Sequence, residues 1–444
     1  MQRFFTSYLL FWIFCTILII GGVFFFFTPK QTHSEQEKRT LAATPRFEWT
    51  QWWSKQYANH VDEYIADHFP YRETWLQTAR TLKQSKGIQD KEVAFVQPVI
   101  LPKKKDTLST TNAKKQISPN KDTLTEFKVK NTTLIQTQTT QNNIPDTEDA
   151  IYKNGILIYK NMALQFFGGN ESMAKYFAKT MNEYHSALSP KNVTVHCVVP
   201  PSSGAFYIPE KYRRGTSEKD NLDCIRKNLN SQVHMPKVYE ILEEHKDEYI
   251  YFNTDHHWTG LGAYYAYQAF CQEAGIDAIP LENMQRKVIP KFLGSLYYVL
   301  QDERLQKGMD SVVYYKINTP YRMYYGKGEG YKEKIRIPLY AEYARGGASY
   351  GVFIGSDHPY IEIDTDLNNG RRAIVLKNSY GNPFVPYLVQ HFDKIIALDY
   401  RYYDGKGVKK LVDQYQITDV IIVTTSVFAN VAWHSDRLKI VLNN

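Results

Sequence analysis

The 444-residue sequence predicts an α/β sandwich, in which helices cover both faces of a mostly parallel sheet. Short apolar runs that alternate with helical patterns from residue 151 to the C-terminus lead to this prediction. Two further observations divide the chain: an uncharged apolar stretch opens it, and a polar segment precedes the alternating part. The hydrophobic content of 43% excludes both a polytopic membrane protein and a chain that is disordered throughout.

The opening stretch predicts an N-terminal transmembrane helix. Residues 4–27 carry no charge and are long enough to cross about 30 Å of hydrocarbon as a helix. A cleaved signal peptide would have small residues before its cleavage site, whereas four consecutive phenylalanines, residues 24–27, stand there. We therefore expect residues 1–30 to be a membrane anchor. Because no later segment could form a second span, we place the remaining chain extracytoplasmic, at the cell surface or in the periplasm.

Residues 31–100 follow the anchor and are predicted to be helical. Apolar side chains recur at helical spacing from Trp52 to Phe69, and a second helical pattern covers residues 73–86. We expect this segment to pack on the main domain. Residues 101–150 are instead rich in Thr, Lys, Gln and Asn and cannot bury enough apolar surface to offset their ordering entropy, so we predict a disordered polar insertion.

The main domain is predicted at residues 151–444. Its strands are expected at residues 193–199, 249–252, 373–376, 395–398 and 420–424, with helices at 258–274, 384–391 and 408–415. A Tyr-rich, irregular insertion of β hairpins and loops is expected at about residues 285–370. Tyrosine is concentrated in this part of the chain, since 17 of the 34 tyrosines fall within residues 290–405.

Charge and cysteine content exclude two further classes of protein. The net charge is +8, from 54 Lys and Arg against 46 Asp and Glu. This excess is mild for the length and no dense basic block occurs, so nucleic-acid binding is not indicated. Four cysteines are too few for a disulfide framework.

The first candidate site is the run Asp255, His256, His257 and Trp258, directly after a predicted strand. Ligands of open α/β sheets bind at the carboxyl ends of strands. Asp255 and His257 lie two residues apart, so in an extended segment both point to one side and the carboxylate can hold the imidazole in one tautomer. This pair is the supporting half of a nucleophilic triad. The alternative is a polar strand end followed by a helix N-terminus.

The second candidate site is the segment 377–383, between a predicted strand and the next helix. Ser379 would lie among exposed backbone N–H groups that can stabilise an oxyanion. Gly381 allows close approach of the backbone. On local sequence alone, an ordinary βα turn is the better interpretation, because Asn, Ser and Gly favour turns. The Asp–His pair at another strand end of the same sheet supports the catalytic interpretation.

Two other places in the sequence offer charged or metal-binding groups. Asp357 and His358 form a second Asp–His pair, but they precede a proline in the irregular insertion, where a turn is the simpler interpretation. Arg401 could bind an anionic group or pair with Asp399, and we favour the pairing.

Metal binding is a rival interpretation of the first site, because Asp255, His256 and His257 could all be ligands. No second cluster has recognisable ligand spacing, and no His-Glu-x-x-His segment occurs in the sequence. We therefore expect no metal and no other cofactor.

The segment Asn-Thr-Asp-His-His-Trp-Thr-Gly-Leu-Gly-Ala, residues 253–263, resembles the signature of the bacterial DHHW proteins. These are related to the alginate O-acetylation proteins, which have an SGNH-hydrolase-like domain. Other blocks of that family are similar to residues 64–72, 376–386 and 398–403. The resemblance covers about residues 45–100 and 151–444. It implies an SGNH-hydrolase-like three-layer α/β/α sandwich.

The resemblance also implies a catalytic triad in the order Asp, His, Ser. Asp255 would be the acid, His257 the base and Ser379 the nucleophile. This chain departs from the pattern before the serine, because Asn378 precedes Ser379 where SGNH hydrolases show Gly-Asp-Ser. Six further residues are expected to support the triad or the oxyanion: His256, Trp258, Asn378, Tyr380, Gly381 and Arg401.

The function that the resemblance implies is that of an anchored serine O-acyltransferase or esterase. It would add or remove acetyl groups on a cell-surface or exported polysaccharide, beside a membrane-bound O-acyltransferase that supplies acyl groups. Aromatic side chains of residues 285–370 would line the glycan groove, although a Tyr-rich β core is the plainer explanation. The main alternative is a catalytically inactive glycan-binding or assembly protein of an exopolysaccharide O-acetylation system, and a metal hydrolase is the third hypothesis.

Overall fold

The computed structural model describes residues 150–444 continuously, and before them residues 56–71 and isolated positions between 25 and 75. Nearly all of the predicted anchor and, apart from Ala150, the predicted polar insertion lie outside these residues. Within the described part of the chain, no helix is long and apolar enough to cross a membrane. The helical pattern after the anchor corresponds to α3 (Gln56–Asp67), and the short strands β1 (His33–Ser34) and β2 (Arg39–Thr40) precede it.

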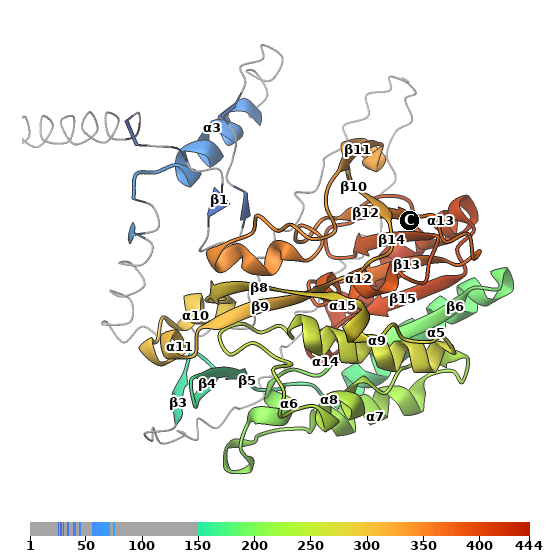
Figure 1. Cartoon of the computed structure of the whole chain (residues 1–444), viewed down its shortest axis with the longest axis horizontal. Helices are drawn as coiled ribbons and strands as arrows, with labels where there is room; N and C mark the ends of the chain where they lie inside the picture. The colour runs from blue at the N-terminus through green and yellow to red at the C-terminus, as the bar shows by residue number, and fades with distance from the viewer. Residues whose placement is uncertain are drawn as a thin grey trace, which may run out of the picture.

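A central sheet of eight strands organises the main domain, with the strand order β11-β10-β12-β14-β13-β15-β6-β7 (Figure 1). Its parallel part contains β6 (Thr194–Val198), β7 (Val233–His234), β13 (Arg372–Lys377), β14 (Lys394–Asp399) and β15 (Asp419–Val423). Its antiparallel edge contains β10 (Tyr321–Lys327), β11 (Glu333–Arg336) and β12 (Tyr360–Thr365). The predicted mixed α/β fold with a mostly parallel sheet is therefore confirmed.

Two hydrophobic cores cover the two faces of this sheet. Successive side chains of a strand point to opposite faces. In β13, Ala373 and Val375 accordingly belong to one core, and Ile374 and Leu376 to the other. The first core is shared with α8 (Val238–Glu244), α9 (Gly260–Ala274) and α12 (Gly381–Leu388). The second is shared with α5 (Glu171–Leu188), α7 (Glu218–Asn228), α13 (Val408–Tyr415) and α15 (Ala432–Asn443).

The remaining elements lie around this sandwich. A three-stranded antiparallel sheet consists of β3 (Ala150–Lys153), β4 (Ile156–Tyr159) and β5 (Met162–Gln165). Two short helices are α6 (Gly204–Tyr207) and α14 (Ser426–Ala429). Short 3-10 helices are η1 (Ser189–Lys191), η2 (Glu210–Tyr212), η3 (Leu281–Asn283), η4 (Glu329–Tyr331) and η5 (Gly346–Val352).

The Tyr-rich insertion is more regular than the sequence indicates. Strands β8 (Gln285–Phe292) and β9 (Asp310–Lys316) pair with each other and enclose α10 (Ser295–Leu300) and α11 (Glu303–Lys307). Strands β10, β11 and β12 extend the central sheet, which the sequence did not predict. Many of its tyrosines are buried, among them Tyr314, Tyr340, Tyr350 and Tyr360. The plainer explanation of the tyrosine content, a Tyr-rich core, therefore accounts for these residues.

The strand predicted at residues 249–252 is wrong. Tyr251 makes only an isolated bridge to Trp258, and the intervening residues form a loop outside the central sheet. The N–H of Phe252 donates to the carbonyl of His257 at 3.2 Å, which closes this loop on itself. Its apolar residues resembled a buried strand because Tyr251 and Phe252 are core residues.

Candidate active site

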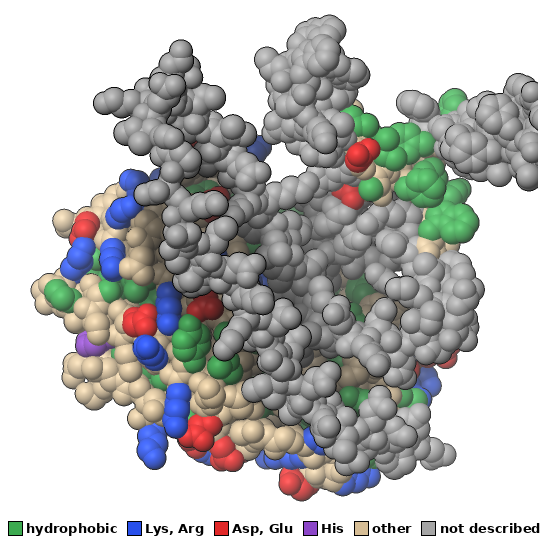
Figure 2. Space-filling view, turned by 180° about the vertical axis from the view of Figure 1, so that it is seen from behind, with side chains coloured by type: hydrophobic (Ala, Val, Ile, Leu, Met, Phe, Trp, Pro, Cys, Tyr) green, Lys and Arg blue, Asp and Glu red, His purple; other side chains and the backbone are tan. Residues whose placement is uncertain are grey.

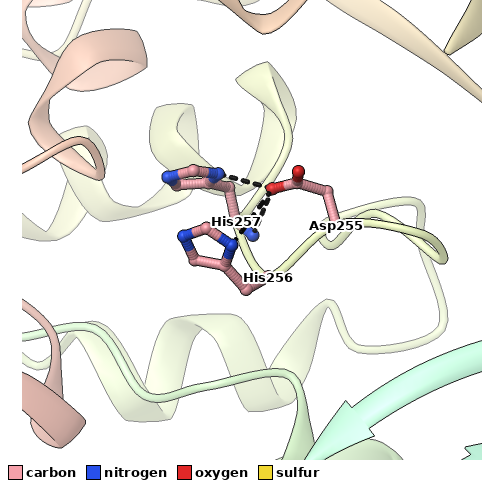
Figure 3. Close-up of side chains that lie close together, drawn as sticks. All are labelled: Asp255, His256 and His257. Carbon is pink, nitrogen blue, oxygen red and sulfur yellow. Dashed lines mark hydrogen bonds and ion pairs between the residues drawn. The ribbon is translucent and has the colours of Figure 1, made fainter. Parts of the chain in front are cut away.

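The loop from Phe252 to Trp258 brings Asp255 and His257 to the start of α9. Thr259 caps this helix, since its hydroxyl accepts a hydrogen bond from the N–H of Gly262 at 3.2 Å. Figure 3 shows that both imidazole rings of the loop lie beside the carboxylate of Asp255. Asp255 is completely buried, and His257 is 6% exposed.

Ser379 lies in the turn between β13 and α12, at the carboxyl end of the strand. The side-chain oxygen of Asn378 accepts a hydrogen bond from the N–H of Tyr380 at 2.9 Å, and its carbonyl accepts one from Gly381 at 3.0 Å. Asparagine favours this geometry because its side chain can mimic a backbone turn. A Cβ atom on Gly381 would lie 2.5 Å from the Cβ of Lys377, so only glycine fits there.

The structure brings the three residues predicted as a triad into one hydrogen-bonded chain. His257 Nε2 lies 2.7 Å from Ser379 Oγ, and His257 Nδ1 lies 2.5 Å from Asp255 Oδ1. A carboxylate only accepts hydrogen bonds, so the imidazole proton belongs on Nδ1. Nε2 then carries the lone pair that accepts the hydroxyl proton of Ser379. This is the arrangement that a serine nucleophile requires from its base.

Asp255 is held in place by residues that sequence reasoning missed. The N–H of Ser295, at the start of α10, donates to Asp255 Oδ2 at 2.6 Å, and the N–H of His257 donates to Oδ1 at 3.1 Å. Gly294 lies so close that an added Cβ would stand 2.2 Å from the Cβ of Asp255. The spacing of glycine and serine in the insertion carries no signal for this contact, because 40 residues separate Ser295 from Asp255.

The buried carboxylate of Asp310 fixes the first part of the loop. It accepts hydrogen bonds from the N–H of Asn253 at 2.9 Å, from the N–H of Thr254 at 2.8 Å and from the hydroxyls of Thr254 and Tyr249. Burial raises the pKa of Asp310, although these four donors oppose the shift. In a strand, the N–H groups of Asn253 and Thr254 would donate to a neighbouring strand. Here they donate to the side chain of Asp310 instead.

Tyr350 of η5 contacts both halves of the candidate triad. Its ring stacks on the imidazole of His257 at a centroid distance of 4.0 Å and an interplanar angle of 17°. Its hydroxyl donates to the carbonyl oxygen of Ser379 at 2.9 Å. No sequence motif indicated this residue.

Trp258, His256 and Tyr380 connect the loop to the serine turn. The indole N–H of Trp258 donates to the carbonyl of Tyr380 at 2.9 Å, and the hydroxyl of Tyr380 donates to the carbonyl of His256. His256 Nδ1 lies 2.6 Å from Ser295 Oγ. These contacts join the loop to the serine turn and to Ser295, and the predicted role of the three residues in supporting the triad stays a prediction.

The backbone donors around Ser379 differ from those expected for the oxyanion. The N–H groups of Asn378, Tyr380, Gly381 and Asn382 all donate to groups of the protein. Tyr380 is therefore not a free backbone donor, because its N–H is bound to the side chain of Asn378. Within the described residues, the N–H of Ser379 itself makes no such bond, and it is the backbone donor that remains for an oxyanion.

Arg401 forms the ion pair with Asp399 that the sequence favoured, and a second one with Asp357 that it did not predict. Its guanidinium contacts Asp399 at 2.6 Å and Asp357 at 2.7 Å. Burial alone would raise the pKa of Asp357, but the charges of Arg401 and Lys377 outweigh it and hold that pKa well below its usual range. Lys377 is fully buried beside both carboxylates, and burial lowers the pKa of its ammonium group. This cluster of two cations and two anions is a structural support beneath the serine turn.

The second Asp–His pair does not form a catalytic constellation. Asp357 belongs to the Arg401 cluster, while His358 stacks on Tyr325 at 4.7 Å. Burial and the charge of Lys377 lower the pKa of His358. The simpler interpretation of this segment as a turn agrees with these contacts.

A metal ion could occupy the first site in place of the hydrogen bonds. One potential ligand atom from each of Asp255, His256 and His257 lies within 4.8 Å of the others, and no other group of this kind occurs among the described residues. The same carboxylate and imidazole also form the chain to Ser379. Metal binding and the hydrogen-bonded chain to Ser379 therefore compete for the same atoms of Asp255 and His257.

Comparison with known proteins identifies the family of this chain. The family model described as "DHHW protein" matches residues 126–398, which is more than half of the chain. A crystal structure of a DHHW family protein from Eubacterium siraeum is similar to the chain at 30% identity, with a TM-score of 0.60. The match covers 68% of this chain and 100% of that one. The chain belongs to the DHHW family.

Two other solved structures are similar to this DHHW protein. Bacillus cereus PatB1, solved with a sulfonyl adduct, has 22% identity and a TM-score of 0.53, covering 62% of this chain and 97% of that one. This likeness concerns the fold. The O-acetyltransferase domain of Pseudomonas putida AlgJ has 13% identity and a TM-score of 0.37, covering 65% of this chain and 98% of that one. No curated protein matches the chain.

Proposed function

We propose that this DHHW protein is a serine O-acyltransferase or esterase that adds or removes acetyl groups on a cell-surface or exported polysaccharide. The chain of hydrogen bonds from Asp255 through His257 to Ser379 is the observation that carries this proposal. An uncleaved N-terminal anchor would hold the domain outside the cytoplasm, near a membrane-bound O-acyltransferase that supplies acyl groups.

The first half of the reaction transfers the acetyl group to the enzyme. Ser379 Oγ attacks the acetyl carbonyl while His257 Nε2 takes the hydroxyl proton, and Asp255 stabilises the imidazolium that forms. The N–H of Ser379 stabilises the oxyanion of the tetrahedral intermediate. Collapse of the intermediate breaks the ester bond, and His257 returns the proton to the departing alcohol.

The second half decides between transfer and hydrolysis. His257 removes a proton from an acceptor, either a sugar hydroxyl or water, which then attacks the acetyl group on Ser379. The intermediate collapses, Ser379 leaves, and His257 returns the proton to it. The same residues therefore serve a transferase and an esterase, and the acceptor that reaches the acetyl-enzyme determines the product.

Acetyl release from an activated ester by the purified protein tests this proposal. We expect Ser379→Ala and His257→Ala to lower the rate at least about 1,000-fold, because each removes a group that acts on the reacting atoms. Ser349→Ala is the matched control, since Ser349 is a buried serine whose hydroxyl has no hydrogen-bond partner within the described residues. Equal turnover by Ser379→Ala and the unmodified protein would contradict the nucleophile assignment.

A catalytically inactive glycan-binding protein is the second candidate function. The observation that favours it is Asn378, which stands where SGNH hydrolases have an aspartate before the serine. Absence of acetyl release, together with polysaccharide binding that survives Ser379→Ala and His257→Ala, would establish it. A metal hydrolase predicts instead that the active preparation contains a stoichiometric metal ion and loses activity with a chelator.

A further inference from the structure

Tyr350 is the only described aromatic residue that has a ring contact with His257 and a hydrogen bond to Ser379. It lies in η5, within the Tyr-rich insertion, and is 8% exposed. Neither the triad pattern nor the DHHW segment includes it. Its position raises the question of whether it fills the core or acts on the chemistry.

We propose that Tyr350 is a positioning residue that aligns His257 with Ser379 and stabilises the imidazolium of His257 during acyl transfer. This inference rests on the proposed function, because it assigns Tyr350 a part in the same reaction. The two contacts contribute separately. The ring acts on the base, and the hydroxyl acts on the backbone that carries the nucleophile.

The ring contact favours the charged form of the base. An aromatic face attracts a cation within about 6 Å of its centroid, and more strongly where water is excluded. The rings of Tyr350 and His257 are nearly parallel at 4.0 Å, and His257 is buried. His257 is neutral before the attack and cationic after it takes the proton from Ser379. The contact is therefore stronger in the transition state than in the resting enzyme, which is the condition for accelerating the reaction.

The hydroxyl contact fixes the serine turn. The carbonyl oxygen of Ser379 accepts hydrogen bonds from Tyr350 at 2.9 Å and from the N–H of Asn382 at 3.1 Å. With its carbonyl held at two points, the peptide that follows Ser379 cannot turn without breaking a buried hydrogen bond, and this fixes the backbone from which Ser379 Oγ projects toward His257. Burial raises the pKa of Tyr350 well above its usual value, so the phenol remains a donor at working pH.

A purely structural role is the competing explanation, because Tyr350 also packs against Phe252 and Phe353. Tyr387 provides a matched control for that role. It is buried in the same core, at 2% exposure against 8% for Tyr350, and its hydroxyl also donates to a backbone carbonyl, that of Gly260 at 2.8 Å. Among the described residues, its hydrogen bond and its ring contacts are with Gly260, Tyr264 and Tyr267, and not with His257 or Ser379.

Kinetic comparison of Tyr350→Phe, Tyr350→Leu and the same two variants of Tyr387 tests the inference. We expect Tyr350→Phe, which keeps the ring, to lower kcat about tenfold, as for one lost hydrogen bond. Tyr350→Leu removes both contacts and should lower kcat about 100-fold or more. KM should change less than about twofold in both variants, because neither contact touches the substrate. The Tyr387 variants should keep the kcat of the unmodified protein, even where they lose as much thermal stability as the Tyr350 variants or more.

Sulfonyl fluoride inactivation gives a second reading that requires no glycan. Sulfonylation attaches the reagent to Ser379 Oγ and releases fluoride, while His257 takes the serine proton. In the Tyr350 variants, the rate constant of inactivation should fall by the same factors as kcat. If Tyr350→Leu does not fold, Tyr350→Phe and Tyr350→Met carry the test, since methionine adapts to aromatic-sized gaps.

The outcomes separate the inference from the function on which it rests. Unchanged kcat and inactivation rates in the Tyr350 variants, with full loss in Ser379→Ala, would overturn the inference alone. Losses that match those of the Tyr387 variants at equal thermal stability would also overturn it, because they show a packing role. Activity that survives Ser379→Ala would overturn the proposed function, and the inference with it.

Discussion

The two halves of the candidate site are built in different ways. Ser379 follows β13, a buried strand paired with parallel neighbours on both sides, so the sheet places it directly. Asp255 and His257 lie in a loop outside the sheet, and this loop is fixed by side chains and N–H groups from the insertion. The serine half rests on local backbone structure, to which Tyr350 and Trp258 add hydrogen bonds, whereas the acid–base half rests mainly on contacts between residues distant in sequence.

This difference predicts where the site is most sensitive to change. A turn between a strand and a helix should be disturbed less when one side chain is altered, because the hydrogen bonds of β13 to its neighbours hold one end of it. The loop of Asp255 has no ladder and depends on a few contacts, those of Ser295, Gly294 and Asp310 among them. Mutations in the insertion should therefore affect catalysis more than mutations in the serine turn that spare Ser379.

Gly294→Ala should show the largest effect of such a mutation. The new Cβ would lie 2.2 Å from the Cβ of Asp255, so Asp255 must shift from the position in which it bonds to His257. We expect kcat to fall about 100-fold, since a displacement of about 1 Å at a catalytic group can cost that much. Steady-state acetyl release from an activated ester measures it. Gly168→Ala is the control, because an added Cβ there meets no atom within 4 Å. Equal rates for both variants would contradict the dependence of Asp255 on this contact.

Asn378→Ala tests the serine half and should have a smaller effect. It removes the acceptor for the N–H of Tyr380 and leaves a buried donor unpaired, which costs about 1–3 kcal/mol. We expect about a tenfold loss of kcat, because part of this free energy appears as disorder of the turn. Asn378→Asp keeps the acceptor and should stay within about threefold of the unmodified protein. A greater loss in Asn378→Asp than in Asn378→Ala would show that Asn378 has another role.

The sequence predicted the parts of the fold and site that depend on local pattern. Helix α13 begins and ends at the predicted residues, and β13, β14 and β15 lie within one residue of their predicted bounds, because continuous apolar runs are typical of buried parallel strands. The same reasoning placed Ser379 at the end of such a strand, but on local sequence alone it favoured an ordinary βα turn; the Asp–His pair and the family resemblance supported the catalytic interpretation, which stays a prediction.

The rest depends on contacts that no local pattern contains. The strand predicted at residues 249–252 failed because buried aromatic residues are also found in loops that side chains hold, here through Asp310. Tyr350 and Ser295 act on residues 29 and 40 positions away, respectively. Burial of Tyr314, Tyr340 and Tyr360 shows that the tyrosine-rich composition reflects packing of the insertion on the sheet as well as its surface, which carries Tyr343.

Substitution of His434, a buried histidine of α15, should have the smallest effect, which is on stability alone. His434 of α15 stacks on Phe428 at 4.1 Å, and its Nδ1 lies 3.1 Å from the hydroxyl of Tyr400. Burial, with a lesser contribution from the charge of Arg401, lowers the pKa of His434 to about 3. The imidazole therefore stays neutral in the folded protein at pH values where it binds a proton in the unfolded chain.

The sign of the pH dependence follows from this difference. Above about pH 6.5 neither state binds the proton and stability is full; as the pH falls toward 3, the unfolded state is favoured by up to about 1.4 kcal/mol per pH unit. His434→Gln should remove this contribution, so its free energy of unfolding should fall less steeply between pH 6 and 4 in denaturant titrations. His245→Gln, which changes a partly exposed histidine, is the control. At neutral pH we expect kcat of His434→Gln to be unchanged, because the sheet, and not this contact, places Ser379. An equal pH slope in both variants would show that His434 binds a proton as readily in the folded state as in the unfolded chain.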